Sequence, residues 1–260
     1  MFAHEGPGRT SRENRLLAGY LAFVGGYVNS AGFLLIGTFT SHVTGNVGRL
    51  SNDLATYQFG AAGTAFAMLS AFFAGAFVAS MLIETNYFGR AANGYATVLF
   101  GEAGLLLLFS AISNFTPLAH ARILDMEAAI LCCAMGMQNS LVTRLSGAVV
   151  RTTHLTGVCT DTAIEAARWF RWWRWDLSQR FGVKLSFGKR HAEKPALPKI
   201  ALLLTITVAF VVGALVGATL GTKIRHAAMF VPAAISGACG VYAFLAGRRN
   251  EEHQGPNSRR

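Results

Sequence analysis

Long apolar runs alternate with short polar or basic segments along the chain, and this pattern predicts helices that cross a membrane. A helix of about 20 apolar residues matches the hydrocarbon core of a bilayer. Six such runs are expected, at residues 16–37, 60–83, 94–113, 123–142, 200–220 and 227–246. A turn containing Pro117 separates the third run from the fourth. The chain is therefore predicted to be an all-α polytopic membrane protein with six transmembrane helices.

Composition favours this class over a soluble one, because apolar residues make up 52% of the chain and charged residues only 14%. The net charge of +10 is concentrated in a few segments between apolar runs, as in cytoplasmic loops, so nucleic-acid binding is disfavoured. The four cysteines show no Cys-x-x-Cys spacing, which argues against a disulfide framework or a zinc site. No phosphate-binding loop or dinucleotide fingerprint is present, and no cofactor is predicted.

The distribution of basic residues predicts the orientation of the spans. Arg9, Arg12 and Arg15 place the N-terminus in the cytoplasm, and the basic residues from Arg248 onward place the C-terminus there too. We therefore expect a multi-pass inner-membrane protein with both termini cytoplasmic. Three spans in each half give the halves opposite orientations, so the domains are predicted to be two inverted repeats. These are residues 1–118 and residues 119–260, the second with a basic, Trp-rich cytoplasmic insertion at about 166–199.

One motif occurs in both halves: Gly-x-x-Asn-Ser, then a β-branched stretch, then His-x-Thr-Gly. The β-branched stretches, residues 36–41 and 149–153, are poor helix interiors and are predicted to be short extended segments. A new helix capped by Thr44 or Thr156 is expected after each. Broken backbone at membrane depth is tolerated where protein or a water-filled cavity satisfies it, and two half-helix starts meeting there would direct two positive dipole ends at one solute. The alternative is that both motifs are structural kinks.

The motif residues and nearby charged residues form the candidate site. The predicted substrate-binding residues are His42, Thr44, Gly45, Asn46, His154, Thr156, Gly157 and Asp161, with Asn29, Gln138 and Asn139 as supporting amides. Glu102, inside the third run, and Glu165, four residues after Asp161, are predicted coupling sites, because an ionisable group at membrane depth is costly. The alternatives are a neutral Glu102 bonded to a neighbouring helix, a solvated helix start at Asp161 and Glu165, and histidines that only bond a carbonyl.

These motifs resemble the YoaK family of small bacterial membrane proteins, a domain of unknown function. The matching residues are Gly-x-x-Asn-Ser with His42-Val-Thr-Gly-Asn46 in the first half, and Gly136-Met-Gln-Asn-Ser, Arg144-Leu-Ser-Gly, Thr153-His-Leu-Thr-Gly and Asp161 in the second. The resemblance covers nearly the whole chain and implies a six-span inner-membrane protein without an established activity. A weaker similarity is to nucleobase and sulfate permeases, which also use paired extended segments leading into half-helices.

Two further patterns predict partners. All four tryptophans lie in Arg168–Trp175, where a helix would put Trp169, Trp172 and Trp173 on one side beside arginines, as suits a segment lying against anionic lipid headgroups. Stacking on single-stranded nucleic acid is the alternative. A stripe of small residues in the fifth run lets another helix approach, either from the same chain or from a second copy in a homodimer; it consists of Gly213, Gly217 and Gly221.

The sequence thus favours a secondary transporter or channel for a small polar or anionic solute, with Glu102 as a candidate proton site. A non-transporting membrane scaffold or sensor is the second hypothesis. A metal-dependent intramembrane hydrolase using His154 and Asp161 is the third, but no third ligand stands at a suitable spacing, and no metal is predicted.

Overall fold

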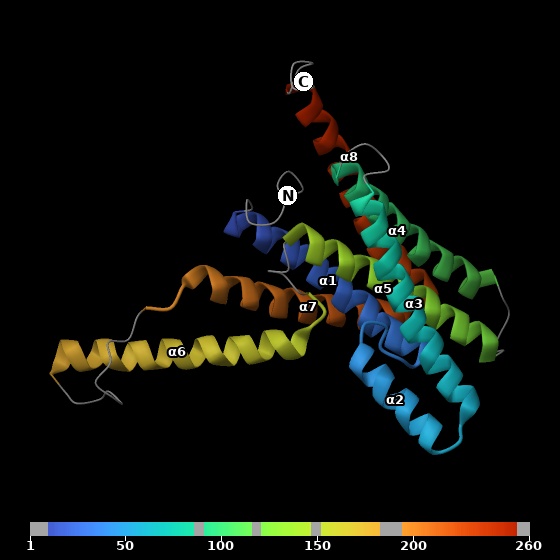
Figure 1. Ribbon diagram of the computed structural model, residues 1–260, viewed down its shortest axis with the longest axis horizontal. Coiled ribbons are helices and arrows are strands. Elements are labelled where there is room, and N and C mark those ends of the chain that lie inside the picture. The colour runs from blue at the N-terminus through green and yellow to red at the C-terminus, as the bar shows by residue number, and fades with distance from the viewer. Residues whose placement is uncertain (1–9, 86–90, 116–120, 147–151, 183–193, 254–260) are drawn as a thin grey trace.

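The computed structural model describes residues 10–85, 91–115, 121–146, 152–182 and 194–253, and every regular element in these ranges is a helix. The elements are α1 (Ser11–Ile36), α2 (Val43–Ala55), α3 (Phe59–Glu84), α4 (Ala91–Phe115), α5 (Ala121–Ser146), α6 (Leu155–Phe181), α7 (Leu197–Ile224), the 3-10 turn η2 (Arg225–Met229) and α8 (Phe230–His253) (Figure 1). The all-α prediction is confirmed, and each of the six apolar runs falls on a long helix. The expected turn at Pro117 and the boundary at residue 118 lie outside the described residues.

Four segments of the described chain are long and apolar enough to cross a membrane: Arg12–Ile36, Phe59–Glu84, Gly94–Ile112 and Leu197–Ala246. The last has 50 residues and contains both α7 and α8, so its length suffices for two crossings. Helix α5 is not among the four, because Asp125, Glu127 and Gln138 lower its mean hydropathy. The membrane class is therefore supported, as the sequence predicted.

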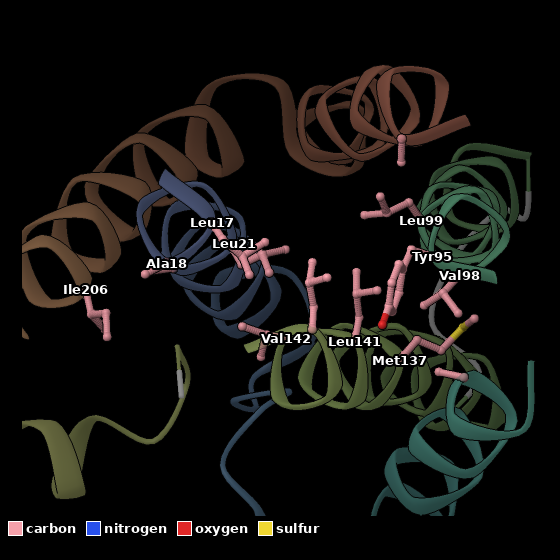
Figure 2. Close-up of a cluster of buried hydrophobic side chains, with 14 of the residues drawn as sticks. Leu17, Ala18, Leu21, Tyr95, Val98, Leu99, Met137, Leu141, Val142 and Ile206 are labelled. Atoms are coloured by element: carbon pink, nitrogen blue, oxygen red, sulfur yellow. The ribbon is translucent and has the colours of Figure 1, made fainter. Parts of the chain in front are cut away.

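The largest buried cluster draws most of its side chains from α1, α4, α5 and α7. Figure 2 shows Leu21 of α1, Leu99 of α4 and Leu141 of α5 facing one another, while Ile206 of α7 lies apart from them. A second buried cluster around Tyr27 continues it along α1 toward η2, and the Tyr27 hydroxyl donates to the Ala228 carbonyl at 2.7 Å. In a bilayer, close packing of this kind replaces the hydrophobic effect as the source of helix association.

Two helix pairs, α1 with α7 and α3 with α5, cross at matching glycines. In each pair a glycine of one helix faces the backbone of the other so closely that a Cβ atom would overlap a carbonyl group. The pairs are also equivalent in sequence. Helices α7 and α3 both contain Ala-Phe-x-x-Gly-Ala, and the glycine of this sequence contacts the helix that carries Gly-x-x-Asn-Ser. The four glycines are Gly26 and Gly213 in the first pair and Gly136 and Gly75 in the second.

Residue contacts along each helix pair show whether the two helices run parallel or antiparallel. Along α1 and α7, Gly19 lies beside Thr205 and Ala31 beside Gly221, so the two helices run parallel. Thr64 with Asp125 and Ser80 with Ser140 show the same for α3 and α5. Helices α1 and α5 run antiparallel, because Gly25 lies beside Gln138 and Gly32 beside Leu131.

The glycine stripe of α7 is used within the chain. Gly213 and Gly217 lie against the backbone of Phe23 and Tyr27 in α1, and Gly221 lies beside Ala31. In this structure the stripe packs against α1 of the same chain, one of the two partners that the sequence left open, and a homodimer stays a prediction.

The break between α1 and α2 differs from the expected extended segment. Helix α1 ends at Ile36, Gly37 caps it with a left-handed φ of 73°, and residues 38–42 pass through a bend and a turn. The prediction of an extended segment at 36–41 is therefore wrong. Of the second expected segment, residues 149–151 lie outside the described residues, while Thr152 and Thr153 lie in bends.

The two new helices also begin earlier than expected. His42 is the N-cap of α2 and His154 is the N-cap of α6, and neither helix has a side-chain cap hydrogen bond. Thr44 and Thr156 therefore lie inside the first turns, and the prediction that they cap the helices is corrected.

Candidate functional site

A cavity of about 650 Å³ lies where the two copies of the motif meet. Its polar lining comes from both halves of the sequence in equivalent sets: Asn29, Ser41, His42 and Thr44 from the first, and Asn139, Thr143, Thr153, His154 and Thr156 from the second. Val43, Leu155 and three phenylalanines complete the wall. The structure thus brings together both histidines, both first-turn threonines and both motif asparagines, which the sequence analysis had singled out separately.

The two asparagines hold the broken segments in place. Asn29 Oδ1 accepts hydrogen bonds from the Ser41 amide at 3.3 Å and the Ser41 hydroxyl at 3.1 Å. Asn139 Oδ1 accepts one from the Thr153 hydroxyl at 2.5 Å, and its Nδ2 donates to the Met135 carbonyl. Each asparagine therefore ties the residue before a histidine back to the preceding helix, which fits the supporting role expected for both.

The two helix starts at the cavity share one geometry. The N-cap φ and ψ are −92° and 70° at His42 and −90° and 59° at His154. Each imidazole lies against the glycine three residues later, Gly45 or Gly157, where a Cβ would crowd Nδ1. These glycines therefore make room for the histidines and do not themselves line the cavity.

The electrostatics of the cavity favour negative charge or a polar acceptor. The first amide groups of a helix lack intrahelical partners and carry the positive end of the helix dipole. Two such ends, at Val43–Thr44 and at Leu155–Thr156, border the cavity. Its described lining contains no Asp, Glu, Lys or Arg, so the two histidines are the titratable groups on its wall.

Three aromatic residues on the wall were missed by the sequence analysis: Phe39, Phe72 and Phe210. Phe39 stacks on Phe33 with ring centroids 4.4 Å apart and stands edge-on to His42. Phe72 and Phe210 occupy the same place in the repeated Ala-Phe-x-x-Gly-Ala sequence of α3 and α7. That second internal repeat was the signal that could have identified them.

Two buried threonine hydroxyls, also missed, accompany the motifs. Thr40 and Thr152 occupy equivalent positions two residues before the histidines, and both side chains are fully or almost fully buried. Neither hydroxyl has a hydrogen-bond partner within the described part of the chain. A buried group without a partner costs about 1–3 kcal/mol. Neither threonine is among the residues that line the cavity.

Two further predicted binding residues, Asn46 and Asp161, and the supporting amide Gln138 lie outside the cavity wall. Asn46 is buried on α2, and Gln138 is fully buried where its Nε2 donates to the Leu21 carbonyl at 3.3 Å. Asp161 is exposed on α6, as expected for a solvated helix start. These three positions are separated from the cavity by the rotation of their helices.

Comparison with known proteins gives the family. A family model described as a protein of unknown function, DUF1275, matches residues 17–242. The chain belongs to this family. No curated protein and no solved structure matches it. The DUF1275 match includes both motifs, every residue of the cavity wall and the Trp-rich part of α6.

Glu102 of this DUF1275 protein is fully buried in α4, away from the cavity wall. Tyr20 of α1 and both Ser236 and Cys239 of α8 surround it, and the Tyr20 hydroxyl donates to the Ser236 hydroxyl at 3.3 Å. Neither carboxyl oxygen has a geometrically good hydrogen bond among the described residues. An ionised carboxylate at membrane depth costs about 3 kcal/mol or more, so this burial favours the neutral acid.

Glu165 takes part in an ion-pair cluster between α6 and α7. It is 2% exposed, and its Oε1 accepts hydrogen bonds from Lys199 at 2.8 Å and Arg168 at 2.7 Å. The Lys199 hydrogen bond, aided by the charge of Arg168, holds the pKa of the Glu165 carboxyl below its ordinary value of 4.5. The structure therefore does not bring Glu165 to the cavity with the histidines, and it differs from the exposed Asp161 one turn earlier.

Proposed function

We propose that this DUF1275 protein is a transporter or channel for a small polar or anionic solute, and that the shared cavity is its solute site. The observation that carries the proposal is that both copies of the His-x-Thr-Gly motif line one cavity, although they come from opposite halves of the sequence. A volume of about 650 Å³ falls within the range of small-molecule sites, roughly 300–1,000 Å³.

The proposed architecture is six spans in an inverted three-plus-three repeat. The equivalent crossings of α1 with α7 and of α3 with α5 support it, as do the antiparallel motif helices α1 and α5. In this arrangement α2 and α6 are half-helices that enter from opposite faces and begin near the middle of the bilayer. Inverted-repeat transporters build midplane sites from such discontinuous helices.

The chemistry of the cavity wall supports an anion or a strong hydrogen-bond acceptor as the solute. The two helix starts supply amide donors and positive dipole ends, and the histidines and threonines supply further donors. Glu102 is proposed as the proton-coupling residue, acting from the α4–α8 contact and not from the cavity.

The proposal also includes the orientation of the protein and its subcellular location. We propose that both termini and the segment 166–199 lie on the cytoplasmic face of an inner membrane, because basic residues near span ends are retained on that side. Cysteine labelling in intact cells tests this directly. Labelling of the 166–199 segment from outside would contradict the inverted repeat.

The test of function is solute flux in proteoliposomes. Purified protein is reconstituted and assayed with a panel of small anions (chloride, nitrate, formate, bicarbonate and sulfate) and neutral uracil. We expect uptake above that of empty liposomes for at least one anion. Binding to the protein without any flux would favour the sensor hypothesis over transport. A hydrolase has less support, because no group of three metal-ligating side chains gathers within the described ranges.

A further inference from the structure

A second cavity, of about 500 Å³, lies between α6 and the segment that enters α7. It shares no lining residue with the first cavity. Its wall is made of Glu165, Arg168, Arg171, Lys194, Pro195, Ala196 and Lys199. Residues from the two ends of the basic insertion therefore come together around one space.

The buried carboxylate of Glu165 organises this wall. It accepts hydrogen bonds from Lys199 of α7 and Arg168 of α6, and so fixes two cationic side chains at the edge of the cavity. The wall holds four cationic side chains and this one carboxylate. The excess of positive charge makes the cavity a site for an anion with more than one acceptor oxygen.

An aromatic surface adjoins the cations. The Lys194 ammonium lies 5.2 Å from the centre of the Trp172 ring, and Trp172 meets Trp169 edge-on with centroids 5.3 Å apart. On the same helix Phe170 and Trp173 are more than half exposed. Basic and aromatic side chains on one helix are typical of segments that lie in the headgroup layer.

We propose that this cavity binds the phosphate headgroup of an anionic membrane lipid. Arginine presents paired N–H donors that match phosphate oxygens, and Arg168 and Arg171 both line the space. The apolar part of α7 begins directly after Lys199, so acyl chains can follow that helix while the headgroup stays in the cavity. A soluble phosphate lacks these chains and would leave the exposed aromatic residues without a role.

The consequence for the molecule concerns α6. Among the described elements α6 contacts α7 alone, and this same helix carries His154 at its N-cap. A lipid headgroup bridging Arg171 of α6 and Lys194 would hold α6 against α7. This role is independent of whether the first cavity carries a solute.

The experiment uses the full-length protein in a neutral detergent. Dihexanoyl-phosphatidylglycerol is titrated while tryptophan fluorescence is recorded, because all four tryptophans lie in residues 169–175. We expect saturable binding that weakens tenfold or more in the double variant Arg171→Gln with Lys194→Gln. Binding should persist in Arg171→Lys with Lys194→Arg, which keeps both charges.

The matched control is Arg174→Gln with Arg180→Gln, which removes two charges from the same helix outside the cavity wall. It should bind within twofold of wild type. If both double Gln variants lose lipid binding equally, the binding depends on the general surface charge of α6, and the proposal is overturned. Equal binding of dihexanoyl-phosphatidylcholine would overturn it too, as would displacement of the lipid by inorganic phosphate at matched concentration, since the latter identifies a soluble ligand. Melting temperatures of all variants confirm that they are folded.

Discussion

Among single residues, Glu102 stands apart because it combines full burial with carboxyl oxygens that lack good hydrogen bonds in the described chain. Its neighbours Tyr20 and Ser236 form a hydrogen-bonded pair that links α1 to α8 beside it. Burying a protonated carboxyl without hydrogen bonds is costly, but burying an ionised one costs far more. Burial therefore favours the neutral acid, and the proposed coupling role requires that this acid also ionises.

Replacing Glu102 by Gln keeps the shape of the neutral acid and removes the titratable group. We expect Glu102→Gln to lower proton-driven uptake at least tenfold while solute exchange without a proton gradient stays within about threefold of wild type. Uptake and exchange in proteoliposomes, with and without an imposed pH gradient, measure both quantities. Equal loss of the two activities would instead assign Glu102 a packing role.

The sequence predicted some residues of the site for clear physical reasons. The repeated motif places polar residues at the ends of two apolar runs, where they are costly to bury. This repetition identified His42, His154, Asn29 and Asn139. The sequence did not distinguish the supporting amides Gln138 and Asn139, because only helix rotation decides that Asn139 faces the cavity while Gln138 bonds the Leu21 carbonyl. The wall residues Phe72 and Phe210 look like ordinary core residues until their repeated sequence context is noticed.

Between helices, the close crossings at glycines set the shape of the bundle. Gly213 faces the backbone of Phe23, so an added methyl group must push α1 and α7 apart. Gly104, in the apolar part of α4, has open space where its Cβ would lie. The two positions form a matched pair for the same substitution.

Gly213→Ala should lower the stability of the protein by about 1–3 kcal/mol, the usual cost of overpacking. Gly104→Ala should be neutral or stabilising by up to about 1 kcal/mol, because alanine favours a helix. Thermal melting in detergent, compared with wild type, measures both effects. Similar melting temperatures for the two variants would refute the role of the close crossing.

Glu165 of α6 forms an ion pair with Lys199 of α7, and we expect this pair to stabilise the contact between the two helices. Because the folded-state pKa of Glu165 is lowered, its stabilising contribution is present above the ordinary value of 4.5 and is lost as the pH falls through the lower folded-state pKa. Amide exchange in α6, corrected for the intrinsic rate, should therefore rise as the pH drops below 4.5. In Glu165→Gln the exchange should be fast already at neutral pH, and α2 serves as the internal reference. Unchanged protection of α6 in this variant would show that the ion pair does not hold the helix.

Helix positions were predictable from hydropathy, but the breaks between helices were not. The β-branched stretch at 36–41 suggested extended backbone, yet Gly37 turns the chain at once and Asn29 bonds Ser41, so the segment folds back on α1. Side-chain hydrogen bonds of this kind depend on tertiary neighbours. For the same reason the sequence alone did not show that the histidines, and not the threonines, occupy the N-caps.

For the whole molecule, the internal symmetry links the fold to the proposed function. The crossings of α1 with α7 and of α3 with α5 repeat residue by residue, and the motif helices α1 and α5 run in opposite directions. The repeated motif in the sequence suggested that the two halves are equivalent. The spatial contacts add that the glycine stripe of α7 packs against α1. If the halves do insert oppositely, a solute site between them is open to either face in turn as one half moves against the other.

The central claim is that both motifs form one solute site, and a double-mutant cycle on His42 and His154 tests it most directly. Flux of the anion that the wild-type protein carries fastest is measured for His42→Ala, His154→Ala and the double variant. Thr160→Ala is the control, since Thr160 is exposed on α6 and bonds only the Thr156 carbonyl of its own helix. We predict about a tenfold loss in each single variant, and a combined loss well short of the product of the two, as for residues that share one ligand. Independent, multiplicative losses, or a loss confined to one histidine, would contradict a shared site.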